Sequence, residues 1–297
     1  MDRIISISTA AFDGHDLSVA LREISQIGLE HIELAFIQGY MDPFGEEIFS
    51  PFYAKKVSRL LSETNLACFA VSAHMDLATE SSLEIFKQRM DFANWVGAKI
   101  IISNAGPQKN ERVFMKNMEE LARVAESLDL IIGLENPGDG KENIIESGKS
   151  GASVIQKIGS DWVKLNYDFG NLLSHLFEKV RPEEDYKYAL PYSAHLHLKD
   201  VRSYEQGWFF TEIGKGSIDY RSILKNLKSE NPSLPLSLEV PLRLTRAPDA
   251  SPRRQALPVP LDEIRRVLQG SINFVERHLG REKSKGSNLY ESNLWKG

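Results

Sequence analysis

The sequence of 297 residues contains a single cysteine, Cys68, which rules out a disulfide within the chain and favours a reducing compartment. No segment approaches the roughly 18 consecutive apolar residues that a membrane-spanning helix requires. The first residues, MDRIISISTAAF, lack the charged segment and long apolar run of a secretion signal. These absences predict a cytoplasmic protein that does not associate with a membrane.

Basic residues are in the minority, because 36 lysines and arginines stand against 41 aspartates and glutamates and give a net charge of −5. A protein whose main role is to bind nucleic acid usually presents a basic surface, so no nucleic-acid partner is expected. The glycine-rich G-x-G-x-x-G turn of a dinucleotide-binding sheet is also missing after the first predicted strand. This absence argues against a doubly wound open sheet.

Short apolar runs alternate with longer amphipathic segments along most of the chain. The predicted strands are residues 4–9, 31–36, 67–74, 99–105, 130–136, 163–168, 195–200 and 234–240. The segments between them are long enough for helices, and many repeat their apolar residues at helical spacing. Eight such units predict an α/β fold, a (β/α)8 TIM barrel that forms a single domain over residues 1–280. Residues 281–297 are predicted to be a C-terminal tail.

Three segments between these elements carry further predictions. Residues 241–260 contain five prolines and four arginines and are predicted to form a long irregular loop. Their arginines could recognise a carboxylate or phosphate as part of a lid, or could form a solvated surface or a subunit contact. The aromatic residues 208–210 are predicted to lie in a loop above the barrel opening. Residues 214–217 are predicted to form a tight turn in which Ser217 caps the following helix.

Seven consecutive predicted strands end in a polar side chain, and functional residues of such barrels come from the carboxyl ends of strands. These residues are Glu33, His74, Asn104, Glu135, Asp168, His197 and Glu239. Alternation along residues 195–200 places His195, His197 and Lys199 on one face and leucines on the other. The strands that carry Asp168 and Glu239 alternate in the same way. We therefore expect the polar faces to point into the barrel.

Three carboxylates that converge on one barrel opening repel each other by about 4 kcal/mol at about 4 Å. Either protonation or a divalent cation could relieve this repulsion. The set Glu135, Asp168, His197 and Glu239 offers three oxygen donors and one imidazole and no thiolate. It favours one divalent metal ion, Mn²⁺, Mg²⁺, Co²⁺ or Zn²⁺, over protonated acids. His195, one layer deeper than His197, is expected to support the site rather than bind the metal.

Other polar residues near these strand ends are candidates for contact with a substrate. His74 and Asn104 are predicted to bind substrate hydroxyl groups. Lys199 and Arg202 could stabilise an enolate or hold an anionic substituent, although an ion pair with Asp200 or Glu135 is an alternative for Lys199. Glu33 could contact the substrate or orient His74.

At these residues the sequence resembles the xylose isomerase-like barrel superfamily, particularly sugar isomerases and epimerases akin to tagatose 3-epimerase and inosose isomerase. The motifs are LEN at Glu135, YDFGN at Asp168, HLHLKD at His197, GKGSIDY, and SLEV at Glu239. The resemblance implies that these four numbered residues are the metal ligands and that Glu135 and Glu239 are also the acid–base pair. The epimerases usually have a histidine three residues after the aspartate, where this sequence has Asn171 as a substrate-binding candidate.

The sequence thus predicts a metal-dependent isomerase or epimerase of a sugar or cyclitol. The enzyme would remove a proton next to a carbonyl group through a metal-stabilised ene-diolate. The alternatives are a lyase resembling inosose dehydratase on the same site, a hydrolase resembling endonuclease IV, and a sugar-binding barrel without catalysis. A homodimer or homotetramer is expected.

Overall fold

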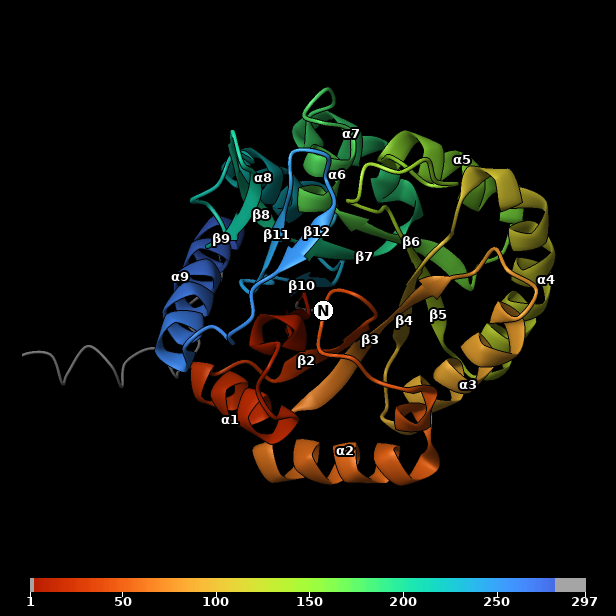
Figure 1. Ribbon diagram of the computed structural model, residues 1–297, viewed down its shortest axis with the longest axis horizontal. Coiled ribbons are helices and arrows are strands. Elements are labelled where there is room, and N and C mark those ends of the chain that lie inside the picture. The colour runs from red at the N-terminus through yellow and green to blue at the C-terminus, as the bar shows by residue number, and fades with distance from the viewer. Residues whose placement is uncertain (1–2, 281–297) are drawn as a thin grey trace, which may run out of the picture.

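Eight parallel strands close into a barrel in the computed structural model, which describes residues 3–280 (Figure 1). They are β1 (Ile5–Ser8), β2 (His31–Ile37), β3 (Ala67–Asp76), β4 (Ile100–Asn104), β5 (Ile131–Glu135), β6 (Val163–Asp168), β7 (Ser193–Leu198) and β10 (Leu236–Leu238). They follow one another around the barrel in chain order, and β10 pairs with β1 to close it. The predicted (β/α)8 TIM barrel is confirmed. The predicted tail, residues 281–297, lies outside the described residues.

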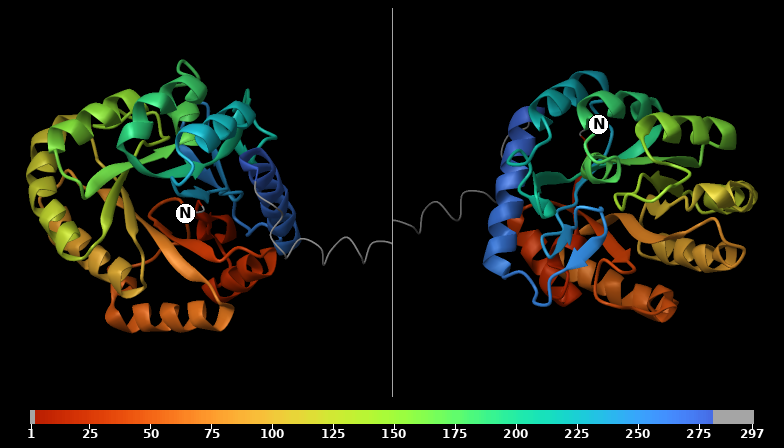
Figure 2. Two further views of the ribbon diagram at one scale, coloured as in Figure 1. Left: turned by 180° about the vertical axis from the view of Figure 1, so that it is seen from behind. Right: turned by 45° about the horizontal axis from the view of Figure 1, so that its top comes forward.

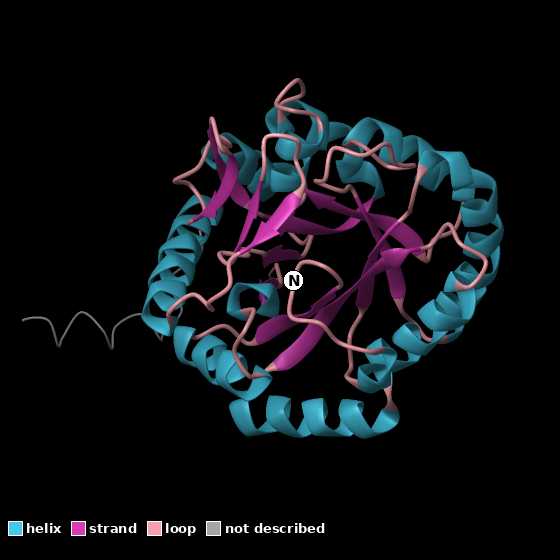
Figure 3. Ribbon diagram, in the orientation of Figure 1, coloured by secondary structure: helices cyan, strands magenta, loops and turns pink. Residues whose placement is uncertain are grey.

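Helices form a ring outside the strands, as Figures 2 and 3 show. They are α1 (Leu17–Ile27), α2 (Pro51–Thr64), α3 (Ser82–Trp95), α4 (Glu111–Ser127), α5 (Gly148–Ile158), α6 (Phe169–His175), α7 (Pro182–Ala189), α8 (Tyr220–Glu230) and α9 (Leu261–Leu279). Short 3-10 helices cover Thr9–Phe12, Glu46–Phe49, Gln108–Asn110 and Leu190–Tyr192. No helix within residues 3–280 is both long and apolar enough to cross a membrane.

The helices begin and pack as their local sequences dictate. The side chain of Ser50 accepts a hydrogen bond from the backbone N–H of Tyr53, and proline follows it at the first position of α2. In α4, Phe114, Met118 and Leu121 recur at helical spacing and are buried. This apolar stripe packs α4 on the strands and leaves its polar residues toward the outside.

A second, smaller sheet lies between α9 and the centre of the barrel in Figure 1. Its strands are β8 (Asp200–Tyr204), β9 (Gly207–Thr211), β11 (Leu244–Arg246) and β12 (Pro252–Arg254), in the order β12-β11-β9-β8. The prediction of a loop over residues 208–210 is therefore wrong. The prediction of an irregular loop over residues 241–260 is wrong for residues 244–246 and 252–254, which form strands. The two segments pair with each other, Thr245 opposite Phe209, and satisfy their backbone groups in an antiparallel ladder.

Gly207 is required for this pairing, because its φ is +118° and a Cβ there would lie 1.9 Å from the carbonyl oxygen of Arg246. We expect Gly207→Ala to lower the free energy of unfolding by about 3 kcal/mol or more, through the clash and the unfavourable φ together. Gly97→Ala is the matched control, since Gly97 has φ +86° but nothing within 4 Å of its Cβ position. Gly97→Ala should lower the free energy of unfolding by only about 1 kcal/mol. Equal losses in urea unfolding of the two variants would contradict this assignment.

The turn after β9 wraps around a buried carboxylate. Asp200 accepts hydrogen bonds from the backbone N–H groups of Gly214 (2.9 Å) and Gly216 (2.8 Å), and also from Val201 (3.0 Å). Burial raises the pKa of Asp200 to about 6 despite these donors. The prediction that Ser217 caps the next helix is wrong, because the Asp219 side chain caps α8. The glycine-rich turn instead holds an anion that belongs to the chain itself.

Candidate metal centre

The register of the barrel strands brings the predicted ligands together. Asp168 of β6 lies opposite His197 of β7, and Glu135 ends β5 next to β6. Glu239 directly follows β10, which pairs with β7. One ligand atom from each of these four residues lies within 4.8 Å of the others, and all four side chains are buried. The strand alternation that predicted a common polar face is therefore what assembles this cluster.

The imidazole of His197 lies at the centre of the cluster. Its Nδ1 is 3.0 Å from Glu135 Oε2, 3.1 Å from Glu239 Oε2 and 3.7 Å from Asp168 Oδ2. Ligand atoms that each lie about 2.1 Å from one cation are about 3.0 Å apart at neighbouring octahedral positions and about 3.4 Å apart in a tetrahedron. His197 Nδ1 is buried without a hydrogen-bond partner, while Asp168 Oδ2 and Glu239 Oε2 are buried and face it with Lys199 Nζ at ion-pair distance. Both observations fit a bound divalent cation.

Glu33 of β2 holds His197 from the opposite side. Its Oε2 lies 2.8 Å from His197 Nε2, and its Oε1 accepts a hydrogen bond from Ser72 Oγ. Burial alone would raise the pKa of Glu33, but the charge of His197 lowers it to about 2. An ionised carboxylate at Nε2 keeps the proton there and leaves Nδ1 free to bind a cation. Glu33 was predicted to contact the substrate or His74, and the structure places it on His197 instead.

Without a cation, the carboxylates keep a proton on His197. Burial alone would lower the pKa of His197, but Glu33, Glu239 and Glu135 raise it well above its usual value. A cation bound at Nδ1 would replace that proton, so its affinity depends on pH.

A layer of hydrogen bonds beneath the cluster fixes Glu135. Asn166 Nδ2 donates to Glu135 Oε2 (2.7 Å), and Asn166 Oδ1 lies 2.8 Å from His195 Nδ1. The other ring nitrogen of His195 lies 3.0 Å from Ser237 Oγ. Burial, together with the charge of His197, lowers the pKa of His195 to about 3, so this ring is neutral. Both nitrogens of His195 are engaged, and it supports the site from below.

Asn171 links the other side of Glu135 to the rest of the site. Its Nδ2 donates to Glu135 Oε1 (2.8 Å), and its Oδ1 accepts from Lys199 Nζ (3.3 Å). Its backbone N–H donates to Asp168 Oδ1, which caps α6 and leaves Asp168 Oδ2 facing the cluster. The structure thus gives Asn171 a positioning role on Glu135, which the sequence reasoning did not foresee.

Lys199 is a buried cation beside the ligands. Its Nζ lies 2.7 Å from Asp168 Oδ2 and 2.5 Å from Glu239 Oε2, rather than on Asp200 or Glu135. Burial alone would lower the pKa of Lys199, but the carboxylates of Asp168, Glu239 and Glu135 raise it. Conversely, Lys199 and His197 overcome the effect of burial and hold the pKa of Glu239 well below its usual range. Glu239 is therefore an ionised carboxylate.

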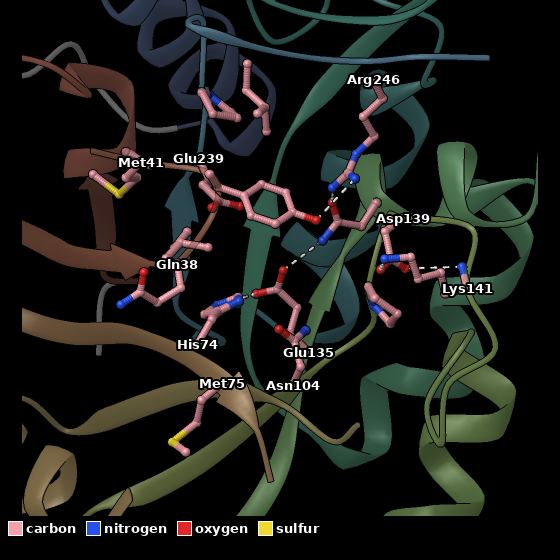
Figure 4. Close-up of a pocket in the computed structure, with 18 of the residues that line it drawn as sticks. Gln38, Met41, His74, Met75, Asn104, Glu135, Asp139, Lys141, Glu239 and Arg246 are labelled. Atoms are coloured by element: carbon pink, nitrogen blue, oxygen red, sulfur yellow. Dashed lines mark hydrogen bonds and ion pairs between the residues drawn. The ribbon is translucent and has the colours of Figure 1, made fainter. Parts of the chain in front are cut away.

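A cavity of about 400 Å³ opens above the cluster (Figure 4). Its lining includes His74, Asn104, Glu135, Asn171, Lys199 and Glu239. His74 Nε2 lies 3.5 Å from Glu135 Oε2, at the boundary between the cavity and the cluster. A volume of this size accommodates a small polar molecule. Within the described residues, the cavity is the place where a substrate can reach Glu135 and Glu239 together.

The sequence matches a family model, the xylose isomerase-like TIM barrel, over residues 21–258. The chain belongs to this family. No curated protein matches its sequence at a significant level.

Solved structures share the overall fold of this xylose isomerase-like barrel at low sequence identity. D-allulose 3-epimerase from Methylomonas sp. is 16% identical with a TM-score of 0.68, over 94% of this chain and 98% of that one. D-psicose 3-epimerase is 12% identical with a TM-score of 0.71, over 94% and 100%. The probable 3-DHS dehydratase of petrobactin synthesis from Bacillus anthracis is 14% identical with a TM-score of 0.63, over 92% and 98%.

One predicted site residue of this xylose isomerase-like barrel lies elsewhere. Arg202 is exposed on β8, and its Nε donates to the carbonyl oxygen of Lys215. The chain leaves the barrel after β7 to form the small sheet, so residues beyond Asp200 no longer follow the alternation that places Lys199 in the cavity. The assignment of Arg202 to the substrate site is wrong for this reason.

Proposed function

We propose that this protein is a divalent-metal-dependent isomerase or epimerase of a sugar or cyclitol. The observation that carries the proposal is the buried cluster of Glu135, Asp168, His197 and Glu239, with ligand atoms within 4.8 Å of one another. Two of its members, Glu135 and Glu239, line a cavity. A divalent cation held by these residues would supply a Lewis acid for the negative charge that develops on a carbonyl oxygen. Mn²⁺, Mg²⁺, Co²⁺ and Zn²⁺ all suit this donor set.

Glu135 and Glu239 are the proposed acid–base pair. Hydrogen bonds from Asn166 and Asn171 fix both oxygens of Glu135. Glu239 borders the same cavity as Glu135, so its carboxylate can reach a carbon next to the carbonyl group of a bound substrate. Return of the proton by the same residue to the neighbouring carbon gives an isomer, and return by the other residue to the opposite face of the original carbon gives an epimer. His74 and Asn104 are proposed to bind substrate hydroxyl groups.

Hydrogen–deuterium exchange in D2O tests this proposal directly. Purified protein is analysed for bound metal, stripped with a chelator and reloaded with Mn²⁺, Mg²⁺, Co²⁺ or Zn²⁺. A panel of ketoses, keto sugar acids and inososes is then incubated with each form. We expect NMR to show loss of one carbon-bound proton signal with loaded protein and none with stripped protein. Absence of exchange for the whole panel with loaded protein would refute the proposal.

A dehydratase on the same site is the second candidate, and Lys199 favours it. Its ammonium group lines the cavity 2.5 Å from Glu239, where its positive charge could stabilise a departing hydroxyl group after proton abstraction. Mass spectrometry distinguishes this reaction, because a dehydratase product has lost one water. A hydrolase resembling endonuclease IV is disfavoured by the net charge of −5, which does not suit a DNA substrate.

A further inference from the structure

Arg246, the last residue of β11, is a buried cation in the wall of the cavity. Its side chain is only 2% exposed, and it lines the same cavity as Glu135 and Glu239. In Figure 4 its guanidinium group points toward the side of the cavity where Glu135 lies. The small sheet carries this residue to the cavity, because Arg246 pairs with Trp208 of β9.

The partners of this guanidinium are all uncharged. Nη1 donates to the carbonyl oxygen of Ala250 (3.3 Å) and to Tyr40 Oη (3.4 Å), and Nη2 donates to Asn171 Oδ1 (3.2 Å). Nε is buried with no hydrogen-bond partner. Within residues 3–280, no ion pair joins Arg246 to a carboxylate.

Two other buried arginines differ from Arg246, because each is paired with a carboxylate. Arg243, three residues earlier, pairs with Asp13 (3.2 Å) and Asp42 (3.1 Å). Arg89 pairs with Glu46. An arginine stays protonated when buried, and a buried charge without a counter-charge is costly. The missing counter-charge of Arg246 therefore points to a ligand.

The surroundings keep the guanidinium in place. It lies over the ring of Tyr40, with its central carbon 5.3 Å from the ring centroid. The guanidinium occupies space that is open because residue 138 is glycine, since a Cβ at Gly138 would lie 2.6 Å from Arg246 Nη2. A side chain at position 138 would displace Arg246. The position is thus fixed before any ligand binds, as expected of a recognition group.

We propose that Arg246 binds a carboxylate of the substrate, so that the substrate is a keto sugar acid rather than a neutral ketose. This inference rests on the proposed function. The planar guanidinium fork matches a carboxylate, and its unpartnered donor is Nε. The side-chain amide of Asn171 contacts both Arg246 and Glu135. One small molecule can therefore place its carboxylate at Arg246 and its reacting carbon at Glu135.

Kinetics of proton exchange with metal-loaded protein test this assignment. The probes are the keto-uronates D-fructuronate and D-tagaturonate, the neutral ketoses D-fructose and D-tagatose, and D-fructose 6-phosphate. For Arg246→Gln we expect the KM of a keto-uronate to rise roughly 10- to 100-fold, with a much smaller change in the KM of the neutral ketose. Arg253→Gln is the matched control, because it removes an exposed guanidinium from the neighbouring strand β12 and should change neither.

Each alternative outcome decides the question. Equal changes in KM for acid and neutral ketoses would overturn the carboxylate assignment, as would an Arg246-dependent preference for the phosphate ester. Arg246→Lys, which keeps the charge without the fork, guards against a folding defect and should lie between wild type and Arg246→Gln. Calorimetric binding of keto-uronates needs no turnover. If no compound exchanges, Arg246-dependent binding still supports this inference while the proposed function fails, and equal binding to wild type and Arg246→Gln overturns it.

Discussion

Glu239→Gln should lower kcat for proton exchange about 1000-fold at saturating metal. The substitution keeps the size of the side chain but removes the ionised oxygen that lies 3.1 Å from His197 Nδ1 and 2.5 Å from Lys199 Nζ. General-base catalysis typically contributes about 10²- to 10⁴-fold, so loss of one member of the acid–base pair is expected to cost this much. The measurement is exchange of the most reactive panel compound, with metal content determined on the same sample.

Glu142→Gln is the matched control for this experiment. Glu142 lines the same cavity but is exposed, so its replacement removes one negative charge without touching the cluster. It should leave kcat within about twofold. Full turnover by metal-loaded Glu239→Gln would remove Glu239 from the acid–base pair.

Replacing Glu33 should weaken metal binding although Glu33 is not one of the four proposed ligands, because its carboxylate holds His197 Nε2. Supporting partners of a metal-binding histidine typically contribute about 10- to 100-fold to affinity. Glu33→Gln keeps an oxygen acceptor for His197 Nε2 but loses the charge, so we expect about a tenfold loss. Glu33→Ala loses both and should approach about 100-fold. Titration of chelator-stripped protein with Mn²⁺ or Zn²⁺ by calorimetry measures these values.

The control for the Glu33 variants is the replacement of Glu23, a carboxylate whose ion pair joins two helices away from the metal centre. Glu23 lies in α1 and pairs with Arg265 of α9 at 2.8 Å. Glu23→Gln should lower thermal stability while the metal affinity stays at the wild-type value. Unchanged affinity in Glu33→Ala would show that His197 does not need this partner, or that Nδ1 is not the ligand atom.

The sequence allowed the barrel and the four-residue cluster to be predicted because both follow from local alternation. Strand parity alone placed Asp168, His197 and Glu239 on inward faces, and parallel pairing then set them at one height. The contact between Glu33 and His197 was out of reach, since it joins β2 and β7, which are not neighbouring strands. It depends on the diameter of the closed barrel, which no local pattern encodes.

The small sheet was missed for a related reason. Prolines and arginines in residues 241–260 indicated a loop, yet the backbone there pairs with a segment more than 30 residues earlier. Non-local pairing of short strands overrides local composition. The burial of Arg246 and its place in the cavity follow from that pairing, so the sequence could suggest an anion-recognising arginine without saying which one.

The shortest strand of the barrel has a consequence for how the protein opens. β10 spans only Leu236–Leu238, and its pairing with β1 and β7 completes the cylinder. Glu239 comes immediately after it, so a cation held by the four ligands would tie the end of β10 to β5, β6 and β7. Metal binding should therefore slow the local unfolding of β10, and loss of the metal should leave this short strand easier to detach from the barrel.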